Sequence, residues 1–226
     1  MRAETGARWN MWARKLVAEA LGTGLLVLAV VGSGIMADRL SDDVGVTLLA
    51  NTMATALALY FLITVLGPVS GGHINPIVTL AFALRREISP GLALAYVPAQ
   101  MLGGICGTVA THAMFGGTLL QGATAAHTGG AQWLSEGIAS FGLIFIILGG
   151  INARANVPVL VAAYIAAALW FTVSSSFANP AGVLARALSD SYTGIRLLDA
   201  PAFWAAEVAG AIIAVAVGGW LFSRDS

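Results

Sequence analysis

The sequence predicts an all-α membrane protein, a bundle of six transmembrane helices with two additional half-helices, arranged as an inverted repeat. Hydrophobic residues make up 58% of the 226 residues and charged residues only 10%, which is far from the composition of a soluble domain. The apolar residues form six blocks, and a helix needs roughly 20 residues to cross a hydrocarbon core of about 30 Å. In addition, each half of the chain carries one Asn-Pro segment.

The six expected spans are separated mostly by Gly, Pro and polar residues. They cover residues 12–36, 45–66, 90–114, 132–151, 157–176 and 201–222. The first block is not expected to be a cleaved signal peptide, because its apolar run continues to Met36 and five comparable blocks follow it. We expect one transmembrane domain over residues 1–226, with one repeat over about 12–114 and the second over about 132–222.

Charge and cysteine content exclude several classes of partner. The net charge is zero and no basic run is present, so the sequence predicts no nucleic-acid partner. The single cysteine, Cys106, allows no intramolecular disulfide and no cysteine cluster for a metal, and we expect it to be a small buried hydrophobe. The lipid bilayer is the expected surrounding, and neither a metal nor a cofactor is expected.

The basic residues predict the orientation in the membrane. With the N terminus in the cytoplasm, eight of them fall inside and three outside, as the positive-inside rule requires. The inside set is Arg2, Arg8, Arg14, Lys15, Arg85, Arg86, Arg154 and Arg224, and the outside set is Arg39, Arg186 and Arg196. Both termini are therefore expected to be cytoplasmic.

The two Asn-Pro segments have the composition of helix starts. Residues 70–80 and 174–184 each pass from a Gly- or Ser-rich stretch through Asn-Pro into moderately apolar residues that are too few to span the bilayer. Asn is a favoured N-cap, and Pro is favoured at the first helical position, where its missing N–H is no loss. The segments Asn75-Pro76-Ile77 and Asn179-Pro180-Ala181 are therefore predicted to begin half-helices.

Other segments recur in the same order in both halves. Residues 18–20 correspond to residues 135–137, which pairs Glu19 with Glu136, and residues 99–103 correspond to residues 206–210. Three spans per half is an odd number, so the second copy must be inverted relative to the first. The half-helices then meet from opposite faces, and irregular backbone at that depth is tolerated where it is packed in protein or lines a water-filled cavity. A central pore is the expected result.

Two helix N-termini at mid-membrane would make such a pore selective. Each helix N-terminus carries roughly half a positive charge, which repels cations and protons. The amide groups of Asn75 and Asn179 would offer N–H donors to a passing oxygen. A neutral solute that carries oxygen is expected to pass in single file.

These residues resemble the aquaporins and aquaglyceroporins of the major intrinsic protein superfamily. The resemblance extends over essentially the whole chain, through Ala18-Glu19, Ser70 to Thr79, Tyr96 to Gly103, Glu136 and Asn179-Pro180-Ala181. It implies an aquaporin-like bundle that is a passive channel rather than an enzyme, assembled as a homotetramer with one pore per subunit. It also implies that Glu19 and Glu136 hold the loops before the half-helices, and that His73 is structural, with a titrating gate as the alternative.

The sequence departs from the family pattern at the expected constriction. Gly182 stands where most members have Arg after the second Asn-Pro-Ala, and Ile77 stands where Ala is usual. Counting by the family's spacing places the other constriction positions on Thr55, Ala167 and Ser176, all of them small. The resemblance therefore implies a wide, weakly polar constriction.

Such a constriction is similar to that of bacterial aquaglyceroporins that pass glycerol or metalloid hydroxides such as arsenous acid. This similarity implies that the protein lies in a bacterial inner membrane. A water-selective aquaporin is the alternative, and an ion-coupled secondary transporter is the alternative from another class.

Two charged residues of the second half have two possible roles each. Arg186 could reach the outer mouth of the pore or pair with Asp190, and Glu207 could pack beside the second half-helix or line the pore.

Overall fold

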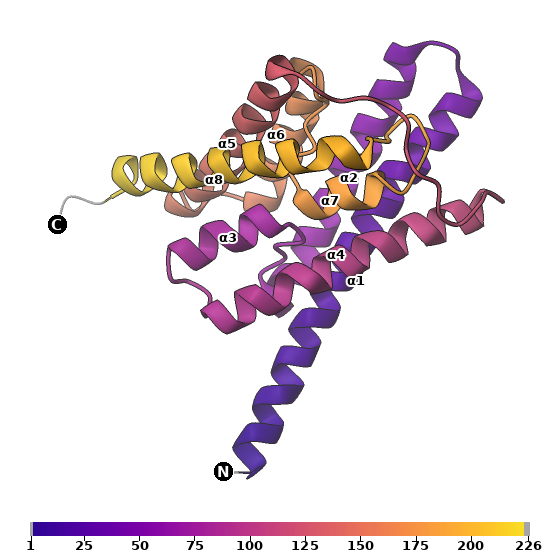
Figure 1. Ribbon diagram of the computed structural model, residues 1–226. Coiled ribbons are helices and arrows are strands. Elements are labelled where there is room, and N and C mark those ends of the chain that lie inside the picture. The colour runs from indigo at the N-terminus through magenta and orange to yellow at the C-terminus, as the bar shows by residue number, and fades with distance from the viewer. Residues whose placement is uncertain (1, 224–226) are drawn as a thin grey trace.

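The computed structural model describes residues 2–223, with side chains from Met11 onward, and every regular element in this range is a helix (Figure 1). The long helices are α1 (Arg2–Leu40), α2 (Val44–Ser70), α4 (Pro90–Met114), α5 (Gly130–Asn152), α6 (Val157–Phe171) and α8 (Ala200–Leu221). The short ones are α3 (Pro76–Leu84) and α7 (Pro180–Arg186), and a 3-10 turn, η1 (Leu197–Asp199), precedes α8. The predicted fold class is confirmed. The side chains of Arg2 and Arg8, and all of Arg224, lie outside the described residues.

Five of the expected spans are helices long and apolar enough to cross a membrane, and the fifth block in the chain is shorter than predicted. The apolar block over 157–176 yields α6, which has only 15 residues. The helix ends because Thr172 takes an extended conformation, with φ −109° and ψ 140°. The chain beyond Thr172 returns as an irregular loop to the start of α7, so part of the block serves as pore loop rather than as membrane span.

Side-chain caps and prolines determine where several helices begin. The carboxylate of Asp43 accepts hydrogen bonds from the backbone N–H groups of Gly45 and Val46, at 2.7 and 3.2 Å, which starts α2. Ser89 caps α4 in the same way and is followed by proline at the first helical position. At its other end α2 stops at Gly71, whose φ of 96° favours a residue without a Cβ.

The two halves use the same close helix contact. A Cβ atom built at Gly103 of α4 would overlap the carbonyl oxygen of Ala20 in α1. At the matching position in the second half, a Cβ at Gly210 of α8 would overlap the carbonyl oxygen of Gly137 in α5. Small residues let helix backbones approach this closely in a membrane. The pairs α1–α4 and α5–α8 thus pack backbone against backbone, while α2 packs against α6 between them.

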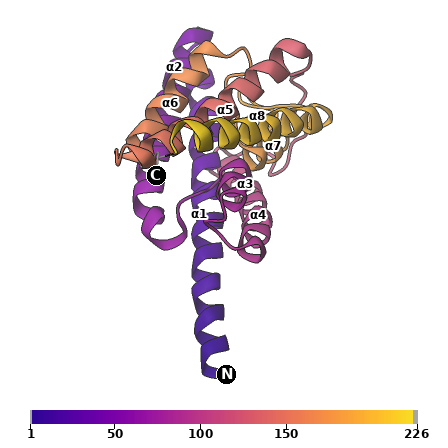
Figure 2. The ribbon, with the colours of Figure 1, turned by 90° about the vertical axis from the view of Figure 1, so that its left-hand side faces the viewer.

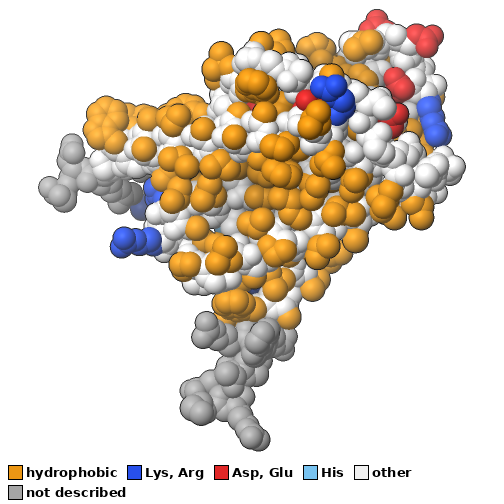
Figure 3. Space-filling model, in the orientation of Figure 1, with side chains coloured by type: hydrophobic (Ala, Val, Ile, Leu, Met, Phe, Trp, Pro, Cys, Tyr) orange, Lys and Arg blue, Asp and Glu red, His pale blue; other side chains and the backbone are white. Residues whose placement is uncertain are grey.

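The outer surface is largely apolar (Figure 3). Exposed hydrophobic side chains include Leu94, Leu134 and Val173, and most of the visible acidic side chains lie toward the end where α1 and α2 meet (Figure 3). The N-terminal part of α1 extends beyond the other helices (Figure 2). Cys106 lies on an exposed face of α4, so the expectation that it is buried is wrong. Its residue type is small and apolar, which suits an outer face toward lipid as well as a core.

The close contact of α5 and α8 predicts different effects of alanine substitution at two glycines of α8. Gly210→Ala should lower the melting temperature by several degrees, because overpacking costs about 1–3 kcal/mol and each kcal/mol moves Tm by about 2–4 °C in a chain of this size. Gly219→Ala, where a Cβ would have nothing within 4 Å, should leave Tm unchanged or raise it slightly. Tryptophan fluorescence of the detergent-solubilised protein during heating measures both. Equal Tm values for the two variants would contradict the contact.

Candidate pore

Both half-helices begin at an asparagine that caps its own helix. The Oδ1 atom of Asn75 accepts a hydrogen bond from the backbone N–H of Ile77, at 3.0 Å. The Oδ1 atom of Asn179 accepts from the N–H groups of Ala181 and Gly182, at 3.1 and 3.3 Å. A proline follows each asparagine at the first helical position. The caps fix the orientation of both amide groups at the tips of α3 and α7.

The two helix tips are joined to each other by a reciprocal pair of hydrogen bonds. The Nδ2 atom of Asn75 donates to the carbonyl oxygen of Ala178, at 2.7 Å, and the Nδ2 atom of Asn179 donates to that of Ile74, at 3.1 Å. Each asparagine therefore binds the residue that precedes the other one. An amide NH₂ group carries two hydrogens, so each asparagine keeps one N–H for another acceptor.

Buried Glu19 anchors the loop before α3. Its carboxylate accepts hydrogen bonds from the backbone N–H groups of His73 and Ile74, at 3.0 and 2.6 Å. The hydroxyl of Ser70 and the side-chain amide of Gln100 donate to the same carboxylate, at 2.6 and 2.7 Å. Four donors satisfy a charge that would be costly at this depth if it were unpaired.

Glu136 has the corresponding place before α7. Its two oxygens accept from the backbone N–H groups of Phe177 and Ala178, at 3.0 and 2.8 Å. The residue before each asparagine has left-handed backbone angles, with φ 44° at Ile74 and 42° at Ala178. Such a conformation costs a non-glycine residue about 1–3 kcal/mol. The hydrogen bonds to the two buried carboxylates offset that strain.

His73 packs as part of the first loop. Its Nδ1 atom lies 3.1 Å from the hydroxyl of Thr79. Its ring stacks on Phe82, with centroids 4.8 Å apart, and meets the edge of Tyr96 at 5.4 Å. The hydroxyl of Tyr96 donates to the carbonyl oxygen of Ser70, at 2.8 Å. Contacts on three sides hold the imidazole in one orientation against the cavity wall.

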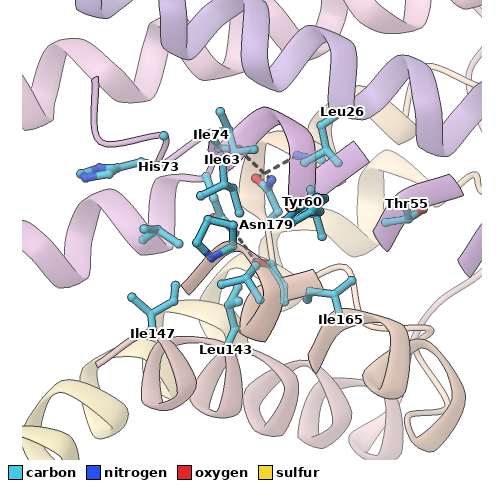
Figure 4. A pocket seen from close by; sticks show the side chains of 18 of the residues that line it. Leu26, Thr55, Tyr60, Ile63, His73, Ile74, Leu143, Ile147, Ile165 and Asn179 are labelled. Atoms are coloured by element: carbon cyan, nitrogen blue, oxygen red, sulfur yellow. Dashed lines mark hydrogen bonds between the residues drawn. The ribbon is translucent and has the colours of Figure 1, made fainter. Parts of the chain in front are cut away.

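A cavity of about 480 Å³ runs past the joined helix tips (Figure 4). On α2 its lining extends from Asn51 to beyond Gly67, which is about 24 Å of helix at 1.5 Å per residue. Figure 4 shows Asn179 in the middle of the labelled side chains, with Leu143 and Ile165 on one side and Leu26 on the other. The cavity thus follows most of the thickness of the bundle and passes both asparagines.

The walls of this cavity are mostly aliphatic. They are formed by Leu26, Leu59, Ile63, Val78, Leu143, Ile147, Val161, Ile165 and Leu169. Among the described residues that line it, Arg186 is the only charged one. In residues 2–223 no group of three or more His, Cys, Asp or Glu side chains could hold a metal ion. The lumen therefore offers hydrogen-bonding groups along apolar walls, and no carboxylate faces it.

Three of the four expected constriction residues line the cavity. Thr55 and Ser176 are 7% and 5% exposed, and their hydroxyls have no hydrogen-bond partner within the described part of the chain. Gly182 also lines it, and a Cβ there would make only ordinary contacts with Asn179, at 3.5 Å or more. Both hydroxyl oxygens are themselves buried, so they lie behind the cavity surface, whereas the space at residue 182 is open to the cavity.

Ala167, the fourth expected constriction residue, does not line the cavity. It lies on the exposed side of α6, whereas Val161, Ile165 and Leu169 line the wall at intervals of four residues. Residue 167 is two positions from 165 and from 169, about 200° around the helix. The position was predicted by counting residues back from the second Asn-Pro motif. That count does not give the rotation of α6, because an irregular stretch separates α6 from α7. The helix is apolar on all sides, so its sequence carried no signal that Leu169 faces inward.

Arg186 lies at the cavity and not against Asp190. Its Nε atom donates to the carbonyl oxygen of Thr193, and its guanidinium lies over the ring of Phe177, 3.3 Å from the centroid. Asp190 instead accepts hydrogen bonds from the N–H and the hydroxyl of Thr124, both at 2.9 Å. The Nε–H group is used by Thr193 and one face of the guanidinium is covered by Phe177, so the terminal amino groups are left to face the cavity.

Ile77 and Glu207 both lie outside the cavity lining. Ile77 is 1% exposed within the main hydrophobic cluster, so its added bulk fills core rather than lumen. Glu207 is fully buried on α8 and accepts a hydrogen bond from the backbone N–H of Asn179, at 2.8 Å. It therefore packs beside the second half-helix.

Comparison with known proteins agrees with this geometry. Residues 7–172 match the family described as Major intrinsic protein. The chain belongs to the major intrinsic protein family. It is 54% identical to Aquaglyceroporin AqpS of Rhizobium meliloti (strain 1021) over 92% of this chain and 90% of that one. It is 29% identical to Aquaporin-4 of Mus musculus over 92% of this chain and 67% of that one.

The fold is also shared with a solved member of the aquaglyceroporins. The X-ray structure of the aquaglyceroporin from Plasmodium falciparum superposes with a TM-score of 0.73 at 21% identity, covering 94% of this chain and 96% of that one. As a major intrinsic protein, the chain is an integral membrane protein and a passive channel for small neutral solutes. The resemblance read from the two Asn-Pro motifs is confirmed.

The orientation of α6 predicts which of its residues controls flux. Leu169→Phe should slow solute entry, because the larger ring would project into the cavity. Ala167→Phe, on the exposed side of the same helix, should not. Light scattering of proteoliposomes under a solute gradient measures both variants, with protein content and monodispersity checked in parallel. If Ala167→Phe slowed solute entry and Leu169→Phe did not, Ala167 would be the residue of α6 that faces the cavity, as family spacing implies.

Proposed function

We propose that this channel passes small neutral hydroxylated molecules, namely glycerol and metalloid hydroxides such as arsenous acid, together with some water. The proposal is carried by the absence of a side chain at Gly182, which leaves open space in a cavity whose other lining residues from the expected constriction, Thr55 and Ser176, are also small. The relative at 54% identity and the solved structure of the same fold are both named as aquaglyceroporins, which supports the same solute class.

The cavity walls suit a solute that is polar on one side and apolar on the other. Leu169 and Ile165 offer aliphatic surface to a carbon chain, while Asn75 and Asn179 each keep one side-chain N–H for its oxygens. A hydrogen bond in the pore replaces one that the solute loses with its hydration shell. Arsenous acid, neutral near pH 7, carries three hydroxyl groups and would use the same partners.

Positive charge along the lumen opposes cations. The N-termini of α3 and α7 meet at the cavity, and the guanidinium of Arg186 adds a full charge there. A coupled transporter that uses Na⁺ or H⁺ would need an acidic or carbonyl site facing the lumen. The described lining contains no carboxylate, which favours a channel over the transporter alternative. The same lack of poised acid–base or nucleophilic groups favours a channel over an enzyme.

The water-selective alternative requires a narrower pore. Ile77, one of the two residues that could have narrowed it, packs into the core. Arg186, the other, is held against Phe177 by stacking and by its bond to Thr193. Space beside Gly182 therefore favours the larger solutes.

We also propose the assembly and orientation of the protein. A homotetramer with one pore per subunit is supported by the large apolar surface and by family membership. Cytoplasmic termini in a bacterial inner membrane are supported by basic residues at the turns after α3 and α5, where Arg85, Arg86 and Arg154 lie. One domain built of two inverted repeats is supported by the matching contacts of Glu19 and Glu136.

Stopped-flow light scattering on proteoliposomes tests the solute proposal. Vesicles are shocked with arsenous acid, glycerol or sucrose, so that shrinkage reports water efflux and re-swelling reports solute entry. We expect fast re-swelling with glycerol and arsenous acid and none with sucrose. Shrinkage without re-swelling faster than in protein-free vesicles would identify a water-selective channel instead.

Gly182 is predicted to be the residue that keeps the constriction open. Gly182→Arg should slow re-swelling by about tenfold or more, a barrier increase of about 1.4 kcal/mol, while shrinkage changes less because water is smaller. Gly182→Ala is the matched control, since a Cβ fits there at ordinary contact distance, and its effect should be much smaller. Unchanged glycerol entry in Gly182→Arg would place the limiting constriction elsewhere.

A further inference from the structure

Glu207 is a buried carboxylic group with one oxygen unaccounted for. It is 0% exposed on α8. Its Oε1 atom accepts from the backbone N–H of Asn179, at 2.8 Å, and its Oε2 atom has no hydrogen-bond partner in the described part of the chain. A buried polar atom without a partner is costly, so its chemical state needs an explanation.

The first half of the chain shows what this position does there. Gln100 is the residue that corresponds to Glu207, and its side-chain N–H group donates to the carboxylate of Glu19, at 2.7 Å. Gln100 thus supplies a donor to the acid that anchors the first loop. In the second half Glu207 accepts from the backbone N–H of Asn179 and Glu136 accepts from that of the residue just before it, so the two carboxyl groups lie close together along one loop. An ionised Glu207 has no donor to supply.

The electrostatics of the pair leave room for one negative charge. Two carboxylates that accept from consecutive backbone N–H groups in a low-dielectric interior repel each other, so we expect only one of them to be ionised. Glu136 accepts two backbone N–H groups and Glu207 accepts only one, so Glu136 is the better place for the charge. The charged groups that act on Glu207 among the described residues are Glu136 on α5 and Arg186 on α7.

We propose that Glu207 is a protonated, uncharged acid whose Oε2–H donates to Glu136 while its Oε1 accepts from the N–H of Asn179, so that it positions Asn179 in the pore. The proton does what the amide of Gln100 does in the first half. Because the acid is neutral, it places no negative charge beside the N-terminus of α7, and the positive potential that opposes cations is retained. This proposal rests on the chain being a channel and not on which solute passes.

Infrared spectroscopy of the reconstituted full-length protein tests the protonation state. The wild type should show the carbonyl stretch of a protonated carboxylic acid in water near neutral pH, and Glu207→Gln should lack it. Glu87→Gln removes an exposed carboxylate that pairs with Arg85, and it should leave the band in place. Absence of the band in the wild type, or its persistence in Glu207→Gln, would overturn the proposal.

Flux through two variants tests the positioning role. Glu207→Met has a similar volume but no polar group, so it should lower solute flux by about tenfold or more because Asn179 loses its anchor and Glu136 its donor. Glu207→Gln keeps one acceptor and one donor and should rescue flux to within about twofold of the wild type. If Glu207→Gln is as defective as the Met variant, a charged Glu207 is required and the proposal is wrong. If Glu207→Met does not fold, the infrared result and the Gln variant still decide.

Discussion

The pair of hydrogen bonds between the two half-helix tips is the interaction on which the rest of the pore depends. Asn75 donates to the carbonyl of Ala178 and Asn179 to that of Ile74, across sequence separations of 103 and 105 residues. Two chain segments that enter from opposite sides are thereby joined end to end at one depth. The cavity has to pass this junction, so both asparagines and both positive helix ends face whatever crosses the membrane.

The junction is stable only because buried acids hold strained loops. Glu19 and Glu136 accept backbone N–H groups from residues that include the left-handed Ile74 and Ala178. The two acids differ in the side chain beside them: Glu19 has the amide of Gln100, and Glu136 has the carboxyl group of Glu207. A proton on the acid makes the two anchors equivalent in hydrogen bonding. The second half then achieves with a titratable group what the first achieves with a permanent donor.

The selectivity of the proposed channel depends on groups set around this junction. The aliphatic wall offers a passing solute no hydrogen bond, so in the proposed channel the solute exchanges its hydration for bonds to the few polar groups at the cavity, among them Asn75, Asn179 and Arg186. Arg186 lies one helical turn after Gly182, so positive charge is kept while the space at residue 182 stays open. Cation exclusion and pore width are thus carried by different residues.

The sequence by itself determined the fold class and the two helix starts at Asn75 and Asn179, because apolar length and N-cap chemistry act locally and leave a recognisable pattern. The anchoring roles of Glu19 and Glu136 followed from the resemblance to the family. Tertiary structure decided which side chains face the lumen. Ala167 and Leu169 are both apolar residues on an apolar helix, and only the packing of α6 against α2 turns one outward and the other inward. Likewise Ile77 could have narrowed the pore or filled the core, and Arg186 could have paired with Asp190 or faced the cavity. Periodicity predicts a helix, but the rotation of a uniformly apolar helix about its axis is determined by its neighbours.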